Sequence, residues 1–162
     1  MRRMYSLNQL QEIALKKIES TTNLKVFENI VDKDGHKRFV EGSAGAKEIT
    51  GITWSYQKWS LSGSHLMVVL AGTVADTTVL ASGTTLAEVD IPKWIYDKLF
   101  PTFSNNLTIT NVKYWGSDWT TQNADVSIKK QDDIIKFVQS NNLTLTAERM
   151  FRIELDLLID NE

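Results

Sequence analysis

The spacing of apolar residues along this chain changes near residue 21, from the period of a helix to that of a strand. In residues 6–19 apolar positions recur every three or four residues, and on a helix they form one stripe: Leu7, Leu10, Ala14 and Ile18. Ser6 and Gln9 have the spacing of a capping box, so the helix is predicted to begin here. A lone helix of this length is marginal in water. It therefore packs either on its own domain or on other subunits of a larger particle, and we expect the second.

Beyond residue 21 the alternation of apolar and polar residues predicts short strands separated by turns. Residues 24–31 and 36–40 flank the turn sequence DKDG at residues 32–35, which predicts a hairpin. In residues 52–56, ITWSY, the large side chains occupy every second position and are predicted to share one face. Residues 66–70, LMVVL, are apolar without interruption, which is typical of a strand covered on both faces.

Nearly the same phrase occurs twice, NNLTIT at residues 105–110 and NNLTLT at residues 141–146. In both copies two asparagines, which tolerate a turn conformation, precede an alternating strand. The flanking sequences differ, so we interpret the phrase as one local structure used twice and not as a duplicated module. Asn106 and Asn142 also stand in Asn-x-Thr sequences, which are glycosylation acceptors only in a eukaryotic secretory setting.

The clearest strand is the last one, in residues 151–159. Its apolar positions are Phe151, Ile153, Leu155, Leu157 and Ile159, and its intervening positions are Arg152, Glu154, Asp156 and Leu158. A slip of one residue would expose all five apolar side chains, at about 1.5–3 kcal/mol each. That loss is as large as the stability of a typical domain, so the register is firmly set. Leu158 on the polar face is either a subunit contact or a stray exposed leucine.

A second, short helix is predicted in residues 91–99, because Ile91, Ile95 and Leu99 are spaced by four, Pro92 suits a first turn and Pro101 ends it. With eight to ten short strands and frequent turns, the chain is predicted to be mainly β, an antiparallel β-sandwich or jelly roll. We expect an anchoring helix in residues 1–20 and a head domain in residues 21–162.

The amino-acid composition excludes some kinds of functional site and argues against some partners. Among the 162 residues there is no cysteine, so disulfides, thiolate metal sites and cysteine nucleophiles are excluded. Lys and Arg number 18 against 20 Asp and Glu, which argues against nucleic-acid binding. No apolar run is long enough to span a membrane, and the start lacks the apolar segment of a signal peptide, so we expect synthesis in a cytoplasm.

The candidate chemistry is sparse, and we expect no catalytic, cofactor or metal site. Ser64 and His65 are neighbours in a strand and therefore point to opposite faces, unlike a nucleophile and its base. Asp32 and Asp34 have the spacing to share an ion, but paired aspartates in a turn usually cap it. Glycoside hydrolysis needs two carboxylates, and among 20 acidic residues such a pair can always be drawn, so that alternative has no specific support.

Aromatic residues are the remaining signal. They form two groups, the first made of Trp54, Tyr56 and Trp59 and the second of Tyr114, Trp115 and Trp119. The second group surrounds the turn sequence GSD at residues 116–118. An exposed aromatic ring in a loop offers a flat face to a sugar or a protein partner, whereas a buried one serves the core or a subunit seam. Both interpretations stay open for each group.

Several stretches resemble bacteriophage virion proteins, especially small fibre and head-fibre proteins. They are MYSLNQLQEIA, KVFENIV, WSLSGSHLMVVLAGTV, LAEVDIPKWIYDKLFP and FRIELDLLID. The resemblance implies a non-catalytic virion protein with a β head, assembled as a homotrimer and attached to other virion proteins through the N-terminal helix. The chain has no long shaft, which favours a compact head or decoration protein. A carbohydrate-binding module, touching a host-surface glycan, is the alternative function.

Overall fold

The computed structural model describes residues 6–12, 31–99 and 108–159, and it separates into two compact units. The first unit comprises Met1–Phe39 with Glu162, and the second comprises Val40–Asn161. The predicted boundary between residues 20 and 21 lies outside the described residues, so it stays a prediction.

In the first unit, residues 7–12 are helical and the capping box is confirmed. The backbone N–H of Ser6 donates to Gln9 Oε1 at 2.9 Å, and the N–H of Gln9 donates to Ser6 Oγ at 3.2 Å. Leu7 and Leu10 are 71% and 49% exposed. Ala14 and Ile18, the other members of the predicted stripe, lie outside the described residues.

The predicted turn at residues 32–35 is also confirmed. The N–H of Gly35 donates to the carbonyl of Asp32 at 3.1 Å, and Val31 pairs with Lys37 in a single antiparallel bridge. Gly35 has a φ of 84°, a left-handed conformation that favours glycine. Residues 24–30 of the predicted hairpin lie outside the described residues.

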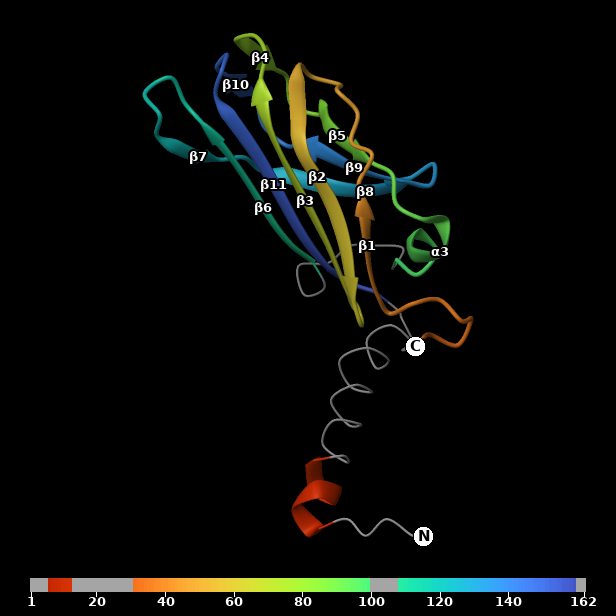
Figure 1. The fold of residues 1–162 in the computed structure, drawn as a ribbon. Helices are drawn as coiled ribbons and strands as arrows, with labels where there is room; N and C mark the ends of the chain where they lie inside the picture. The colour runs from red at the N-terminus through yellow and green to blue at the C-terminus, as the bar shows by residue number, and fades with distance from the viewer. Residues whose placement is uncertain (1–5, 13–30, 100–107, 160–162) are drawn as a thin grey trace. The chain divides into compact units, whose positions relative to one another are not determined.

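The second unit is built from antiparallel sheets (Figure 1). The largest has six strands in the order β1 (Phe39–Ser43), β2 (Ile52–Ser62), β3 (His65–Val74), β11 (Met150–Leu158), β6 (Thr108–Trp115) and β7 (Thr121–Asn123). A three-stranded sheet has the order β5 (Thr85–Val89), β9 (Ile134–Gln139) and β8 (Val126–Gln131). A two-stranded sheet pairs β10 (Leu143–Leu145) with β4 (Thr78–Leu80).

The three- and six-stranded sheets share one hydrophobic core. Leu86, Ile135 and Phe137 of the smaller sheet belong to the same buried cluster as Leu70 and Ile153 of the larger sheet. In Figure 1 strand β8 of the smaller sheet crosses behind the long strands β2, β3 and β11, and β9 lies next to it. The prediction of a mainly β, antiparallel chain is therefore confirmed. The shared core supports a two-layered sandwich, and the jelly-roll connectivity stays a prediction.

The short helix α3 (Lys93–Tyr96) closes one part of this core. Pro92 is its N-cap, and Ile91, Ile95 and Leu99 are all buried, as their spacing by four predicted. The predicted stop at Pro101 lies outside the described residues.

The two copies of the asparagine-rich phrase end in different sheets. The second copy forms β10, in which Leu143 and Leu145 are buried and Thr144 is exposed, and it pairs with β4. The first copy leads into β6, which pairs with β11 and β7. The copies thus end in strands of different sheets, and their interpretation as one local structure used twice stays a prediction.

Strand β11 has the register that its pattern predicts, with Phe151, Ile153, Leu155 and Leu157 buried and Leu158 half-buried on the opposite face. Strand β2 departs from prediction. A bulge lies between Trp54 and Tyr56, and it turns Tyr56 to the outer face, where it is 50% exposed. Simple alternation placed Tyr56 with Ile52 and Trp54, and that placement is wrong because the bulge adds one residue to the strand.

Strand β3 is not covered on both faces. Leu66, Val68 and Leu70 are buried, but Met67 is 45% exposed and Val69 is half-buried on the outer face. The apolar run therefore packs on the core on one side only in this single chain. Among the described residues, no helix has the length and apolarity needed to cross a membrane.

Candidate functional site

The outer face of the six-stranded sheet carries a group of polar side chains on its strands β6, β7 and β11. Because side chains alternate along a strand, the residues between the buried ones of β11 point away from the core. On β11 these are Arg152, Glu154 and Asp156, and on the neighbouring β6 they are Asn111, Lys113 and Trp115. The strand register places Arg152 directly opposite Lys113 and Glu154 directly opposite Asn111.

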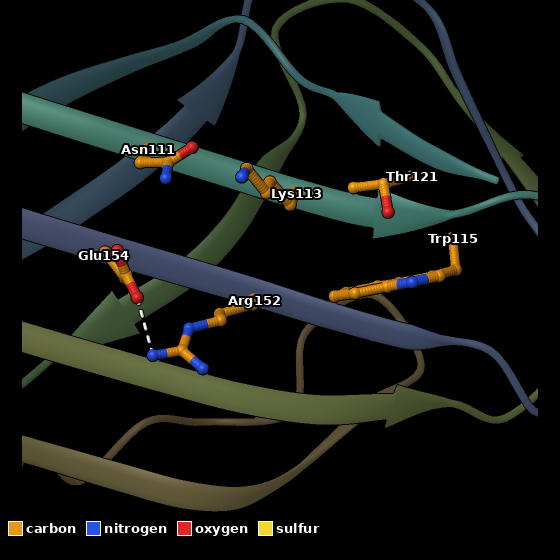
Figure 2. A pocket seen from close by; sticks show the side chains of 6 residues that line it. All are labelled: Asn111, Lys113, Trp115, Thr121, Arg152 and Glu154. Atoms are coloured by element: carbon orange, nitrogen blue, oxygen red, sulfur yellow. Dashed lines mark ion pairs between the residues drawn. The ribbon is translucent and has the colours of Figure 1, made fainter.

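These side chains line a hollow of about 400 Å³ (Figure 2). Its lining consists of Asn111, Lys113, Trp115, Thr121, Arg152 and Glu154. Thr121 comes from β7, where it lies opposite Trp115. Figure 2 shows the indole of Trp115 edge-on, reaching from the end of β6 toward the side chain of Arg152. The hollow therefore combines one aromatic ring with amide, hydroxyl and charged groups.

The charges in the hollow are not balanced. Arg152 Nη2 lies 2.6 Å from Glu154 Oε1, which pairs these two side chains. Lys113 lies opposite Arg152 and has no ion pair among the residues that the structure describes. Two cationic side chains and one anionic side chain thus line the hollow, which leaves an excess of one positive charge.

A row of aromatic rings on the inner face supports the strands that carry the hollow. Phe151 is fully buried between Trp54, whose ring it meets edge to face at 6.1 Å, and Tyr114, on which it stacks at 6.2 Å. Gly72 of β3 lies opposite both Trp54 and Phe151 in the register. The absence of a side chain at Gly72 lets rings from β2 and β11 meet across the strand between them. The outer side chains of β11 and β6 are thus mounted on a packed inner layer.

The structure separates the three aromatic residues that the sequence singled out. Trp115 faces the hollow, but Tyr114 points to the inner face, as its ring stack on Phe151 shows. The hydroxyl of Tyr114 donates to Gln122 Oε1 at 2.7 Å, and burial raises its pKa above the ordinary value. Tyr114 therefore stays a protonated donor at neutral pH and serves the packing of the sheet.

Trp119 occupies the loop between β6 and β7 and is 58% exposed. Its φ of 63° is unusual for a residue other than glycine. The guanidinium carbon of Arg149 lies 3.8 Å from the centroid of its ring, and Arg149 also donates to the carbonyls of Gly116 and Ser117. One face of Trp119 is thus already occupied, and Trp119 does not line the hollow.

The first aromatic group divides in a similar way. Trp54 and Trp59 are buried in the core, as the packing interpretation expected, and Trp59 lies directly over Gly42. Tyr56 is instead on the outer face, beside Lys58, whose ammonium group lies 2.7 Å from Glu41 Oε2. The hydrogen bond to Glu41 raises the pKa of Lys58 above its usual value, so Lys58 stays charged at neutral pH.

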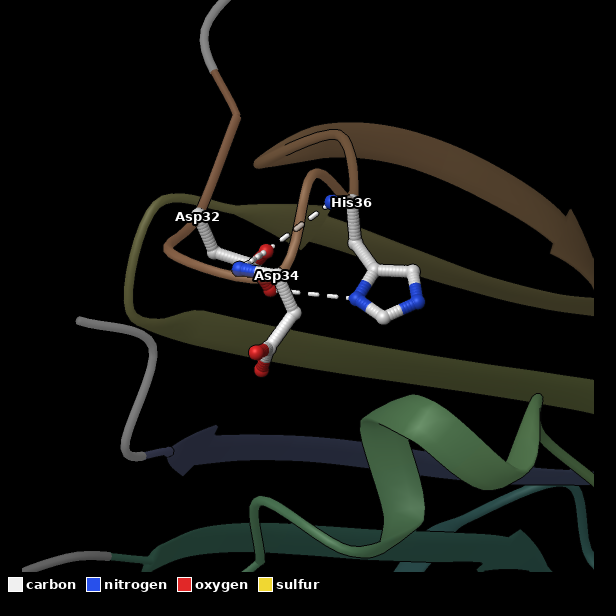
Figure 3. Close-up of side chains that lie close together, drawn as sticks. All are labelled: Asp32, Asp34 and His36. Carbon is white, nitrogen blue, oxygen red and sulfur yellow. Dashed lines mark hydrogen bonds and ion pairs between the residues drawn. The ribbon is translucent and has the colours of Figure 1, made fainter.

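The turn at residues 32–36 brings together Asp32, Asp34 and His36, whose ligand atoms lie within 4.8 Å of one another (Figure 3). Asp32 Oδ1 accepts hydrogen bonds from the backbone N–H groups of Asp34 and His36, both at 2.9 Å. Asp32 Oδ2 lies 3.4 Å from His36 Nδ1. The Asp32 carboxylate is thus engaged as the cap of the turn, which is the role that the sequence favoured.

His65 lies at the exposed start of β3, with its Nδ1 3.1 Å from Asp156 Oδ1. An aspartate in this position orients an imidazole, but a general base also needs a hydroxyl or thiol on its other nitrogen. No such hydrogen bond to His65 is found within residues 6–12, 31–99 and 108–159.

The residues of the hollow other than Trp115 were missed by the sequence analysis. The signal was present in the alternation of residues 151–159, which assigns Arg152 and Glu154 to the face away from the core. Their pairing with Lys113 and Asn111 depends on β6 and β11 being neighbours, which the sequence does not reveal. Comparison with known protein families and with curated proteins gives no match for this chain.

Proposed function

We propose that this chain is a non-catalytic recognition protein of a bacteriophage particle, whose β unit binds a saccharide on the outer face of its six-stranded sheet. The particle is assembled in the host cytoplasm, and the N-terminal helix attaches the protein to other virion components. The observation that carries the recognition role is the hollow around Trp115 on the outer side of β6, β7 and β11. The resemblance of the sequence to small phage fibre proteins supports the setting.

The chemistry of the hollow suits a sugar. A sugar ring presents a face of C–H groups that packs on an aromatic ring, and hydroxyl groups around its rim that need hydrogen-bond partners. Trp115 supplies the ring, while Asn111 and Thr121 supply neutral polar groups. Because these side chains stand on paired strands and not on a long loop, little ordering is needed on binding.

Titration of the full chain against a glycan array, followed by calorimetry on the best saccharide, tests this role. We expect Trp115→Ala to weaken binding five- to tenfold, because the loss of one stacking contact costs about 1–1.4 kcal/mol. Trp119→Ala is the matched control, since Trp119 lies outside the hollow and is stacked on Arg149. If Trp115→Ala leaves the affinity unchanged, the hollow is not the binding site.

A structural role within the particle is the second part of the proposal. Leu7 and Leu10 are exposed on one stripe of the capped N-terminal helix, which supports its use as an attachment to a neighbouring chain. Met67 and Tyr56 are exposed on the outer face of β3 and β2, which supports a contact between copies in a homotrimer. Light scattering coupled to size-exclusion chromatography measures the mass of the protein in solution, and hence the number of chains in the assembly. A monomer at every concentration would overturn the trimer.

A further inference from the structure

We propose that the saccharide bound by the hollow is acidic, with its carboxylate or phosphate group held between Lys113 and Arg152 and its ring packed on Trp115. This inference rests on the proposed recognition function and goes beyond it by naming the class of ligand. It follows from the placement of charge on β6 and β11, which the fold itself does not explain.

The first step is the cross-strand pairing. Arg152 and Lys113 are directly opposite each other on neighbouring antiparallel strands and point to the same face. Like charges in directly opposite positions destabilise a sheet. An anion placed between the two side chains would remove this repulsion and gain two charge-assisted hydrogen bonds.

The second step is the lack of an internal partner for the second cation. Glu154 is the one carboxylate in the lining, and it already pairs with Arg152 at 2.6 Å. Lys113 has no ion pair in the part of the chain that the structure describes. By contrast, Lys58 on the same sheet face pairs with Glu41 at 2.7 Å. Among the described residues, the hollow is therefore the place on this face where a positive charge is left over.

The third step is the donor geometry. The contact with Glu154 uses Nη2 of Arg152, and a guanidinium group carries five N–H donors in a planar fork that suits a carboxylate or phosphate. The lysine adds a point charge on a flexible stem from the facing strand. A volume of about 400 Å³ lies within the range of small-molecule sites. These features together favour a ligand with one anionic group beside a neutral ring.

The experiment compares matched pairs of oligosaccharides on an array, each pair differing only by a carboxylate or a phosphate group. Cellobiose, cellobiouronic acid and cellobiose 6′-phosphate form one such series, and acidic and neutral forms of other hexoses extend it. We expect each acidic member that binds to do so at least tenfold more tightly than its neutral counterpart. Raising the salt concentration should weaken the binding of the acidic ligand and leave the affinity for the neutral ligand unchanged.

Lys113→Gln is the decisive variant. It relieves the like-charge pairing with Arg152, so the protein should be as stable as the wild type or more stable, which separates a binding defect from unfolding. We expect it to reduce the affinity for the acidic ligand to that for the neutral ligand. Lys58→Gln, on the same sheet face but outside the hollow, is the control and should leave the preference intact.

The outcomes separate the two proposals. A preference for carboxylate alone, or for phosphate alone, supports the inference and identifies the source of the anion. Equal binding of acidic and neutral members, still lost in Trp115→Ala, overturns the inference and leaves the recognition function standing. If no saccharide binds in any arm, both proposals are wrong.

Discussion

Replacing Gly72 by alanine tests the close packing of β2 on β3, because the packing predicts whether the free energy of unfolding falls or rises. It lies on β3 opposite Trp54 and Phe151, whose rings meet over it. A β-carbon built on Gly72 would overlap the carbonyl oxygen of Thr53 and would lie 3.0 Å from its carbonyl carbon. The third nearest atom is Ile52 Cγ2 at 3.1 Å. Two of these three atoms belong to the backbone of the adjacent strand, which cannot rotate away as a flexible side chain would.

The expected magnitude follows from two opposing effects. Replacing glycine by alanine where space is free stabilises a protein by about 0.4–1 kcal/mol, because the unfolded chain loses freedom. Forcing an extra carbon into a filled site costs about 1–3 kcal/mol. For Gly72→Ala the second effect is larger, since the strand β2 would have to shift next to its bulge. We expect a net loss of about 1–2 kcal/mol in the free energy of unfolding.

Urea denaturation followed by tryptophan fluorescence measures this loss as a lower midpoint with an unchanged slope. Ala71→Gly, at the next position of the same strand but on the outer face, is the control. It should cost about 0.5–1 kcal/mol through chain entropy alone. Gly72→Ala and Ala71→Gly, although opposite replacements, should thus both lower the free energy of unfolding. A Gly72→Ala protein as stable as the wild type would show that β2 and β3 do not approach each other as described.

Three further predictions concern the supports of the hollow and its neighbouring loop. Phe151→Ala should cost about 3–5 kcal/mol in urea denaturation, because Phe151 is fully buried between two rings. Hydrogen bonds from the Thr120 hydroxyl and backbone N–H lower the pKa of Asp118, so its stabilising effect should be complete above the ordinary pKa near 3.8 and lost as the pH falls through the lowered value. The side chain in Asp118→Asn does not titrate. Denaturation at several pH values should therefore show that the wild type is more stable than this variant at neutral pH and loses this difference in acid. Arg149→Ala should uncover Trp119 and speed its quenching by acrylamide.

Much of the fold could be predicted because local patterns determine it. The capping box of Ser6 and Gln9, the buried set of β11 and the short helix with Ile95 all follow from spacing alone. In each case one face must be buried or one backbone group satisfied, and few conformations achieve this. The bulge before Tyr56 was not predictable, because Ser55 and its neighbours carry no glycine or other bulge signal.

The candidate site was less predictable than the fold, for a physical reason. Trp115 was identified because tryptophan near a turn is informative by itself, but Tyr114 beside it faces the other side of the sheet. Lys113 and Arg152 are far apart in the sequence, and only the pairing of β6 with β11 makes them neighbours. Strand pairing between distant segments leaves no local pattern, so the hollow emerges only from the topology.

The outer face of β3 leads to a last prediction. The uninterrupted apolar run of residues 66–70 is typical of a strand covered on both faces, yet in this chain Met67 is 45% exposed and Val69 half-buried. If a second copy covers this face, Met67→Glu should lower the mass in light scattering to that of one chain, since a buried unpaired charge is costly. For a face open to water, the same change should alter the free energy of unfolding by less than about 0.5 kcal/mol. An unchanged mass together with unchanged stability would show that the face is open, and the trimer contact would then have to lie elsewhere on the chain.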